Sequence, residues 1–319
     1  MAIKLGVLDL VPVLEASDSA AALEQAVRLA RTAEELGYSR YWAAEHHDLP
    51  GLACPAPEVL LAYIGAQTER IRLGSGALLL PHYKPIKVAE TFRLLASLCP
   101  GRMDLGIGRA PGGSAHVSLA LSDNFLDNVR RLPESIQALS ALLTDQYELE
   151  GHPVTARPIP PCPPELWMLG TNDRSASYAA QFGTGYVFGQ FMSERDGVEV
   201  LSAYRKQFQP SALAQAPQAV VAINILCAET EEEALRLASE GSSMWNPHGN
   251  KKEESQTVKP NGLVGTAEQV KARLEEYQKL YGVDEFLAVT LTGDYNSRLR
   301  SYELLAQALS RCEDADLNA

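Results

Sequence analysis

The sequence predicts an α/β fold, a (β/α)8 TIM barrel with insertions after strands 4 and 7. About eight short apolar runs alternate with amphipathic stretches along the 319 residues. Each run is apolar on both faces, as parallel strands covered by helices are. Eight such units in this length fit a closed barrel better than an open, doubly wound sheet. The sequence has no repeat at a period of about 20–50 residues and no second composition regime, so we expect one domain over residues 1–319.

The first four units are apolar runs, each followed by a helical pattern. The first helix ends before Gly37, a residue type common just beyond a helix C-terminus. Proline removes a backbone donor, so the fourth helical stretch is expected to break near Pro133. Residues 145–164 then hold six prolines and are interpreted as an insertion. We expect strands at Ile3–Asp9, Arg40–Ala44, Ile71–Leu80 and Met103–Gly108, and helices at Ala20–Leu36, Pro57–Gln67, Pro85–Leu98 and Val117–Leu143.

The second four units continue the same alternation. It is interrupted at Ser242–Gly262, which is polar, rich in Gly, Asn, Lys and Glu, and without periodicity. Thr266 and Gln269 fit a capping box at the start of the next helix. We expect strands at Leu166–Leu169, Tyr186–Phe188, Ala219–Cys227 and Glu285–Thr292, and helices at Asn172–Phe182, Val198–Phe208, Glu231–Glu240, Ala267–Tyr281 and Ser297–Ser310.

The charge and the cysteines limit the classes of partner and the compartment. Lys and Arg number 28 against 40 Asp and Glu, which leaves a formal charge of −12. Nucleic acids and anionic membranes reward a basic surface, so we expect neither as a partner, although a local pocket can still hold an anion. The five cysteines form no CxxC pair, the N-terminus does not resemble a signal peptide, and no apolar run approaches the ~20 residues that span a bilayer. We therefore expect reduced thiols in a cytoplasmic protein.

Two adjacent histidines, His46 and His47, follow Glu45 at the end of the second predicted strand. Functional residues of such barrels gather where strands end and loops begin. Neighbouring strand residues point to opposite sides, so the two histidines cannot easily share one metal, and neither HxH nor HExxH occurs. We expect no metal site and interpret the pair as acid/base or substrate-orienting groups. Ordinary loop histidines are the alternative.

Glycines surround the ends of the third and fourth predicted strands. The segment Gly106–Gly112 has the spacing GxGxxxG rather than GxGxxG, which makes a dinucleotide-binding interpretation weak. Arg109 leaves the fourth strand where it suits an anion or a negatively charged ring system. A solvated arginine in a tight turn explains it equally well. Gly74 and Gly76 leave room beside the backbone for a flat ligand, with a simple bulge as the alternative.

Thr171, Asn172 and Ser175 follow Gly170 at the end of the fifth predicted strand. Backbone N–H groups at a helix start, together with hydroxyl and amide side chains, can hold a phosphate. Asn172 is also an ordinary N-cap residue, and capping alone explains half of the pattern. Spacing by itself therefore predicts a barrel enzyme with an anion-holding site and no more specific function.

Four segments in a fixed order carry a resemblance that covers essentially the whole chain. They are residues 42–47 (WAAEHH), 74–81 (GSGALLLP), 101–109 (GRMDLGIGR) and 264–270 (VGTAEQV). Together they resemble the bacterial luciferase-like, flavin-dependent monooxygenases. The resemblance implies a (β/α)8 barrel, usually a homodimer, that binds FMN or its reduced form without a covalent bond.

The resemblance also implies roles for individual residues. It places His46 near the reactive edge of the flavin as the catalytic histidine. It places a non-proline cis peptide bond at Gly76–Ala77, packed behind the flavin ring, so both residues are expected to bind the cofactor. Bacterial luciferase carries a glutamate where Thr171 stands and a cysteine in place of Gly108, which argues against light emission and leaves flavin binding. The flavin or its phosphate is assigned to Arg109, and the phosphate also to Thr171, Asn172 and Ser175.

The activity that the resemblance implies is oxygenation of a small organic substrate by reduced FMN and O2. No nicotinamide fingerprint is evident, so a separate flavin reductase is expected to deliver the reduced FMN. Two alternatives stay open: a protein that stores or senses FMN without turnover, and a deazaflavin-dependent reductase or dehydrogenase on the same barrel.

The segment Ser242–Gly262 is expected to be a lid over the site. A structureless stretch of this length is uncommon in a compact barrel unless it is functional or disordered. Met244 and Trp245 favour a lid, because large apolar side chains are costly to leave exposed. A solvated surface loop is the alternative.

Overall fold

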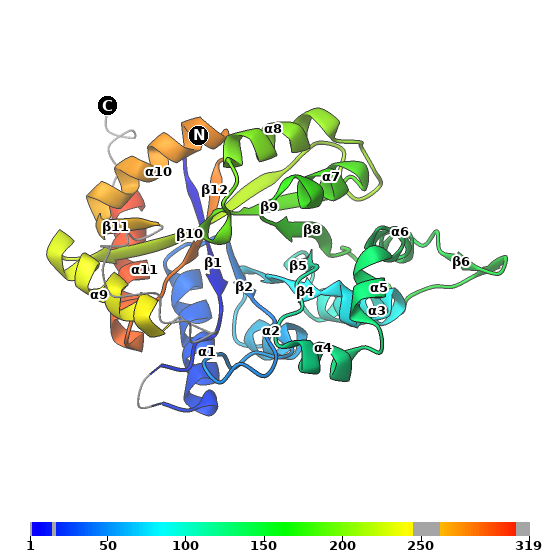
Figure 1. The fold of residues 1–319 in the computed structure, drawn as a ribbon, viewed down its shortest axis with the longest axis horizontal. Coiled ribbons are helices and arrows are strands. Elements are labelled where there is room, and N and C mark those ends of the chain that lie inside the picture. Colours follow the sequence, from blue (N-terminus) through cyan, green and yellow to red (C-terminus); the bar gives the residue numbers. More distant parts are fainter. Residues whose placement is uncertain (1, 15–16, 245–261, 311–319) are drawn as a thin grey trace.

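A closed barrel of parallel strands forms the centre of the molecule. The computed structural model describes residues 2–14, 17–244 and 262–310. Within these residues, the strands pair in the order β10-β12-β1-β2-β3-β5-β8-β9. β9 pairs with β10 in turn, which closes the sheet and confirms the predicted (β/α)8 barrel (Figure 1). The barrel strands are β1 (Lys4–Asp9), β2 (Arg40–Ala43), β3 (Arg72–Ser75), β5 (Met103–Gly108), β8 (Glu165–Gly170), β9 (Gly185–Gly189), β10 (Ala219–Ala228) and β12 (Glu285–Val289).

Helices follow the strands and cover the outside of the barrel (Figure 1). Asp18 caps the first helix by accepting a 2.8 Å hydrogen bond from the N–H of Ala21. The predicted capping box of Thr266 and Gln269 is present. The helices are α1 (Ser19–Glu35), α2 (Pro57–Gly65), α3 (Pro85–Leu98), α4 (Ala115–Leu121), α5 (Phe125–Arg130), α6 (Leu132–Leu143), α7 (Asp173–Gln181), α8 (Gly197–Gln207), α9 (Glu231–Met244), α10 (Ala267–Tyr281) and α11 (Tyr295–Ser310), with 3-10 turns η1 (Leu80–His82) and η2 (Gln190–Met192).

The insertion after the fourth barrel strand contains more helices than predicted. The helix expected at 117–143, with a break near Pro133, is divided into α4, α5 and α6. The break near Pro133 is confirmed, since α5 ends at Arg130 and α6 begins at Leu132. The earlier break was not predicted, and there Asn124 begins a new helix by accepting from the N–H of Asp127. Pro133 lies within the first turn of α6, where a missing N–H costs nothing. Strands β6 (Glu148–Leu149) and β7 (His152–Pro153) then form a hairpin that projects from the barrel at the right of Figure 1.

The insertion after the seventh barrel strand contains a strand that the sequence pattern did not reveal. β11 (Leu263–Thr266) pairs in parallel with the end of β10. It was missed because it directly follows the polar segment and runs into the capping box of α10. Residues 245–261, which hold most of the expected lid, lie outside the described residues.

The predicted third strand is divided in two. β3 ends at Ser75, and β4 (Leu78–Leu79) pairs separately with β5. Between them lies a cis peptide bond at Gly76–Ala77. This confirms the non-proline cis bond that the resemblance implied.

Side chains that face the barrel axis form their own apolar cluster. Trp42 and Trp167 lie edge to face, with ring centroids 5.8 Å apart. A Cβ atom at Gly74 would come within 2.5 Å of Trp42 Nε1, and one at Gly76 within 2.4 Å of Leu8 Cδ1. Trp42 and Leu8 therefore fill the space into which a Cβ atom at these glycines would point, and room for a flat ligand on another side of this backbone stays a prediction.

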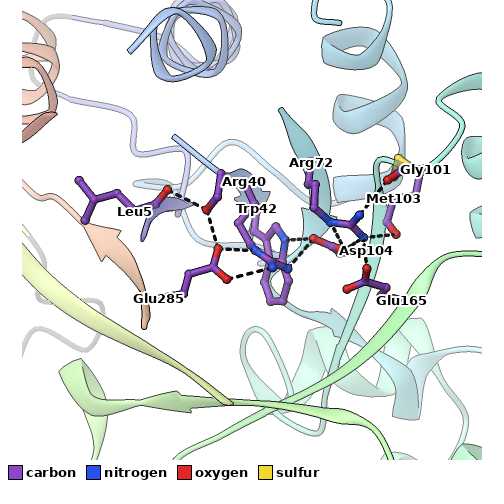
Figure 2. Close-up of polar contacts among 10 residues, drawn as sticks. Leu5, Arg40, Trp42, Arg72, Gly101, Met103, Asp104, Glu165 and Glu285 are labelled. Atoms are coloured by element: carbon purple, nitrogen blue, oxygen red, sulfur yellow. Dashed lines mark hydrogen bonds and ion pairs between the residues drawn. The ribbon is translucent and has the colours of Figure 1, made fainter. Parts of the chain in front are cut away.

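The N-terminal end of the barrel is closed by a buried network of charged side chains (Figure 2). Asp104 is fully buried. It accepts hydrogen bonds from Arg40 Nη1 at 3.0 Å and Trp42 Nε1 at 2.9 Å, and from Arg72 Nε at 3.0 Å. Glu285 binds the other side of the Arg40 guanidinium through two hydrogen bonds of 2.7 and 3.0 Å. These buried charged side chains all have hydrogen-bond partners within the network, so we assign the network a structural role. The functional site is then expected at the C-terminal end of the barrel.

None of the described helices is long and apolar enough to cross a membrane. Cys54, Cys99 and Cys227 are buried and Cys162 is exposed, and all four are free thiols.

Candidate flavin site at the C-terminal end of the barrel

The C-terminal ends of the barrel strands surround an apolar floor. Leu52, Leu169, Phe191 and Leu291 are half-buried and pack against the cluster inside the barrel. All barrel strands run in parallel, so the loops that follow them meet over this floor. The predicted site residues lie on or next to these loops.

His46 lies in the loop beyond β2, three residues after the strand ends. Its N–H donates to the carbonyl oxygen of Cys54 at 3.0 Å, and the residue is half-buried. Burial, together with the neighbouring charge of His47, lowers the pKa of His46 to about 4. The imidazole is therefore neutral at physiological pH, which differs from the near-neutral titration expected of a histidine. A neutral ring can accept a proton or a hydrogen bond, and it does not carry a standing positive charge.

Glu45 joins the loop beyond β2 to its neighbours. The residue is 2% exposed. Its Oε1 lies 2.8 Å from Nε2 of His47 and accepts from the hydroxyl of Tyr83 at 2.9 Å. Its Oε2 accepts from the N–H of Leu79 at 2.9 Å. Sequence reasoning assigned no role to Glu45, although a carboxylate directly after a buried apolar strand was a signal of one.

The cis peptide bond at Gly76–Ala77 lies beside the end of β5. Gly76 donates its N–H to Ala43 at 2.7 Å, which joins this segment to β2. A Cβ atom at Gly108 would come within 3.1 Å of Ala77 Cβ, so glycine at this position keeps Ala77 uncrowded. Ala77 itself is half-buried. Contact of Gly76 and Ala77 with a flavin stays a prediction.

Arg109 follows β5 directly and is half-buried. No hydrogen bond or ion pair joins its guanidinium to any residue that the structure describes. Ile107 of β5 pairs with Met168 of β8, so Arg109 leaves the barrel at the level of Gly170. A partly buried cation without an internal anion, next to the start of a helix, is suited to hold a phosphate.

Thr171, Asn172 and Ser175 are brought together at the start of α7. Asn172 Oδ1 accepts from the N–H groups of Arg174 and Ser175 at 3.2 and 3.3 Å. Ser175 is 4% exposed, and its Oγ donates to the carbonyl oxygen of Asn172 at 2.7 Å. The capping explanation is therefore confirmed for Asn172 and Ser175. Whether the same residues also hold a phosphate stays a prediction, and no hydrogen bond joins them to Arg109.

Among the described residues, no group of three or more His, Cys, Asp or Glu side chains is placed to hold a metal ion. A cavity of about 980 Å³ opens at the opposite end of the barrel and is lined by residues such as Lys4 of β1, Lys271 of α10 and Leu309 of α11. It contains none of the predicted site residues.

Comparison with known protein sequences gives a family match and named relatives. The family model described as luciferase-like monooxygenase matches residues 3–284. The chain is 32% identical to the luciferase-like monooxygenase of Escherichia coli strain K12, over 95% of this chain and 96% of that protein. It is 34% identical to the N-acetyl-S-alkylcysteine monooxygenase of Bacillus subtilis, over 96% and 98%. It is 23% identical to the oxygenase component of the flavin-dependent trigonelline monooxygenase of Acinetobacter baylyi, over 82% of each chain.

Solved structures share the fold over nearly the full length. Apo-MsnO8 superposes with a TM-score of 0.87 at 35% identity, covering 97% of this chain and 98% of that one. The FMN complex of the oxygenating constituent of 3,6-diketocamphane monooxygenase from Pseudomonas putida superposes with a TM-score of 0.73 at 20% identity, over 98% of each chain. An F420-dependent secondary alcohol dehydrogenase does so with a TM-score of 0.70 at 16% identity, over 97% of this chain and 99% of that one. At such low identities the last two show the fold alone.

Proposed function

This chain belongs to the luciferase-like monooxygenase family, and from that premise we propose that it uses reduced FMN and O2 to oxygenate a small organic substrate. The observation that carries FMN binding is the free guanidinium of Arg109 at the C-terminal end of β5, level with the start of α7. The apolar floor below it suits a flat ring system, and α7 adds helix N-terminal dipole to the phosphate end. The residues present therefore fit FMN.

Bound reduced FMN supplies two electrons to O2, so that one oxygen atom enters the substrate and the other leaves as water. The chain's own residues hold and shield the reacting groups. Arg109 binds the phosphate, and the half-buried side chains of Leu169, Phe191 and Leu291 keep water away from the ring. Neutral His46 accepts a proton or orients the substrate next to the flavin edge.

Reduced FMN is proposed to come from a separate flavin reductase. The Acinetobacter relative is described as an oxygenase component, which supports a two-component arrangement. The test is to supply chemically reduced FMN and ¹⁸O₂ with an N-acetyl-S-alkylcysteine, the substrate class for which the Bacillus relative is named. A product with one ¹⁸O atom supports the proposal. Tight binding of oxidised FMN without any oxygen chemistry would favour storage, and preference for deazaflavin over FMN would favour hydride transfer.

Replacing Arg109 by alanine is expected to weaken FMN binding about tenfold or more and to leave riboflavin binding nearly unchanged. A hydrogen bond to a charged group contributes roughly 1.5–3 kcal/mol, and 1.4 kcal/mol is a factor of ten. Riboflavin lacks the phosphate, so the guanidinium has nothing to hold there. Fluorescence titration with both flavins measures the difference.

The matched control for this prediction is Arg28→Ala, which removes an exposed arginine of α1. It should leave both affinities unchanged. Equal weakening of FMN and riboflavin by Arg109→Ala would show that the arginine contacts the ring or supports its loop.

We also propose that the chain forms a homodimer through an apolar face of α2 and α3. On α2, Val59 and Tyr63 are 67% and 63% exposed, and on the adjacent α3, Leu94 and Leu98 are 50% and 65% exposed. Each pair has the i, i+4 spacing that places side chains on one face of a helix. Large apolar side chains gathered in this way mark an interaction surface.

Leu98→Glu is expected to convert the dimer to a monomer, because it would bury a charge in that apolar interface. Leu149→Glu on the projecting hairpin serves as the control, since Leu149 is 57% exposed and belongs to β6 rather than to α2 or α3. Light scattering after size-exclusion chromatography gives the mass. A dimer that persists in Leu98→Glu, or a monomer before any substitution, would contradict the proposed interface.

A further inference from the structure

The carboxylate of Glu45 forms hydrogen bonds with three residues around the candidate site. Its Oε1 lies 2.8 Å from Nε2 of His47 in the loop beyond β2, and the carboxylate accepts from the N–H of Leu79 in β4 and from the hydroxyl of Tyr83, which follows η1 and precedes α3. Burial, and then the charge of Glu45, raise the pKa of Tyr83. The phenol therefore remains a donor over the whole physiological range.

Two of the three partners of Glu45 are close in sequence to a predicted site residue. His47 directly follows His46, and Leu79 lies two residues after Ala77. The Glu45 carboxylate therefore fixes the segment that carries the histidine against the segment that carries the cis peptide bond.

The loop beyond β5 is joined to the same point. The N–H of His47 donates to the carbonyl oxygen of Gly112 at 2.8 Å, three residues beyond Arg109. Gly112 has φ +71°, and a Cβ atom there would come within 2.2 Å of Leu79 Cδ1 and 3.3 Å of His47 Cδ2. Glycine is required at this position both for its backbone conformation and for the close approach.

We propose that Glu45 is a positioning residue, which holds the loops bearing His46, Gly76–Ala77 and Arg109 in one arrangement and so couples O2 consumption to oxygenation of the substrate. The inference rests on the proposed function for its catalytic consequence. The contacts themselves do not depend on it.

Glu45→Gln is the sharpest substitution because it keeps the shape and removes one acceptor. Oε1 accepts from the hydroxyl of Tyr83 and Oε2 from the N–H of Leu79, so a glutamine must turn its NH₂ group toward one of these donors. That contact is lost, and a buried donor is left without a partner. Tyr83→Phe removes a single donor and keeps the carboxylate, so it tests the same contact point if Glu45→Gln folds poorly.

Glu285→Gln is the matched control. Glu285 also accepts from three donors, Ser39 Oγ and two nitrogens of Arg40, and its side chain is 12% exposed, but it lies at the opposite end of the barrel (Figure 2). Both variants replace a carboxylate with three polar contacts by an amide, although Glu285 is paired with the Arg40 guanidinium and Glu45 contacts His47, Leu79 and Tyr83. Glu285→Gln therefore shows what the loss of a carboxylate remote from the candidate site does to each readout.

Two readouts test the proposal. Amide hydrogen exchange at Leu79 should become at least tenfold faster in Glu45→Gln and change less than threefold in Glu285→Gln. With reduced FMN, O2 and the thioether probe, Glu45→Gln should release at least three times more peroxide per product formed, while its affinity for FMN changes less than threefold. Tyr83→Phe should shift both readouts in the same direction by a smaller factor.

The outcomes separate the two proposals. Unchanged exchange at Leu79, or equal effects of Glu45→Gln and Glu285→Gln on both readouts, would overturn the positioning role. Faster exchange in Glu45→Gln without a change in the peroxide-to-product ratio would overturn its catalytic consequence. Faster exchange together with no oxygenation by the unaltered chain in any condition would overturn the proposed function and support the contact.

Discussion

Replacing Asp104 by alanine is expected to lower the free energy of unfolding by roughly 3–5 kcal/mol, the usual effect of removing one partner from a buried ion pair. Asp104 is fully buried and accepts from Arg40, Arg72 and Trp42. Without it, both guanidinium groups lose an anion while they remain inside the protein. Urea denaturation followed by circular dichroism measures the change.

Glu165→Gln provides the comparison for this prediction. Glu165 contacts Arg72 at 2.9 Å from a side chain that is 45% exposed, and exposed ion pairs contribute about 1 kcal/mol or less. If Asp104→Ala destabilised the protein no more than Glu165→Gln, the network at the N-terminal end would not be a main source of stability.

Replacing His46 by alanine is expected to reduce product formation at least roughly tenfold, which corresponds to about 1.4 kcal/mol of barrier. Fold and FMN binding should be retained, because alanine keeps the backbone N–H that donates to the carbonyl oxygen of Cys54 and fixes the loop. Initial rates with reduced FMN measure the effect. Unchanged turnover would show that His46 has a structural role only.

The pH dependence of the same residue follows from its environment. Burial and the charge of His47 lower the pKa of His46 to about 4, whereas an unfolded chain has a histidine pKa near 6.5. The native state resists protonation of His46, whereas the unfolded chain takes up that proton below about pH 6.5. The contribution of neutral His46 to the free energy of unfolding is therefore complete above about pH 6.5 and is lost as the pH falls toward 4. Product formation should therefore show no loss from His46 protonation between about pH 6 and 8, and His46→Ala should be less sensitive to acid unfolding in that lower window. An NMR titration that placed the pKa of His46 near 6.5 would contradict this account.

The barrel could be predicted from sequence because its signal is repeated. Runs such as Met103–Gly108 are apolar throughout, and their alternation with helices leaves few other architectures. Strand breaks and helix boundaries that depend on one local contact could not be predicted from the sequence. The break of the predicted third strand lies at one peptide bond, and the three helices α4–α6 depend on caps such as Asn124.

Only part of the candidate site could be predicted from the sequence. Position along the chain was enough to place Arg109 at a strand end and to identify Asn172 as a cap. The role of Glu45 was not visible, because its partners Leu79 and Tyr83 are 34 and 38 residues away and meet it only in the folded chain. The lowered pKa of His46 likewise depends on burial, which a sequence pattern does not show.

The central claim, that this barrel directs the reaction of reduced FMN with O2, can be tested without knowing the substrate. Protein loaded anaerobically with reduced FMN is mixed with oxygenated buffer in a stopped-flow spectrometer, with free reduced FMN as the reference. We expect an absorbing species distinct from both reduced and oxidised flavin, and a return to oxidised FMN that is slower than for the free flavin. Reoxidation as fast as that of free reduced FMN, with no such species at any oxygen concentration, would contradict it.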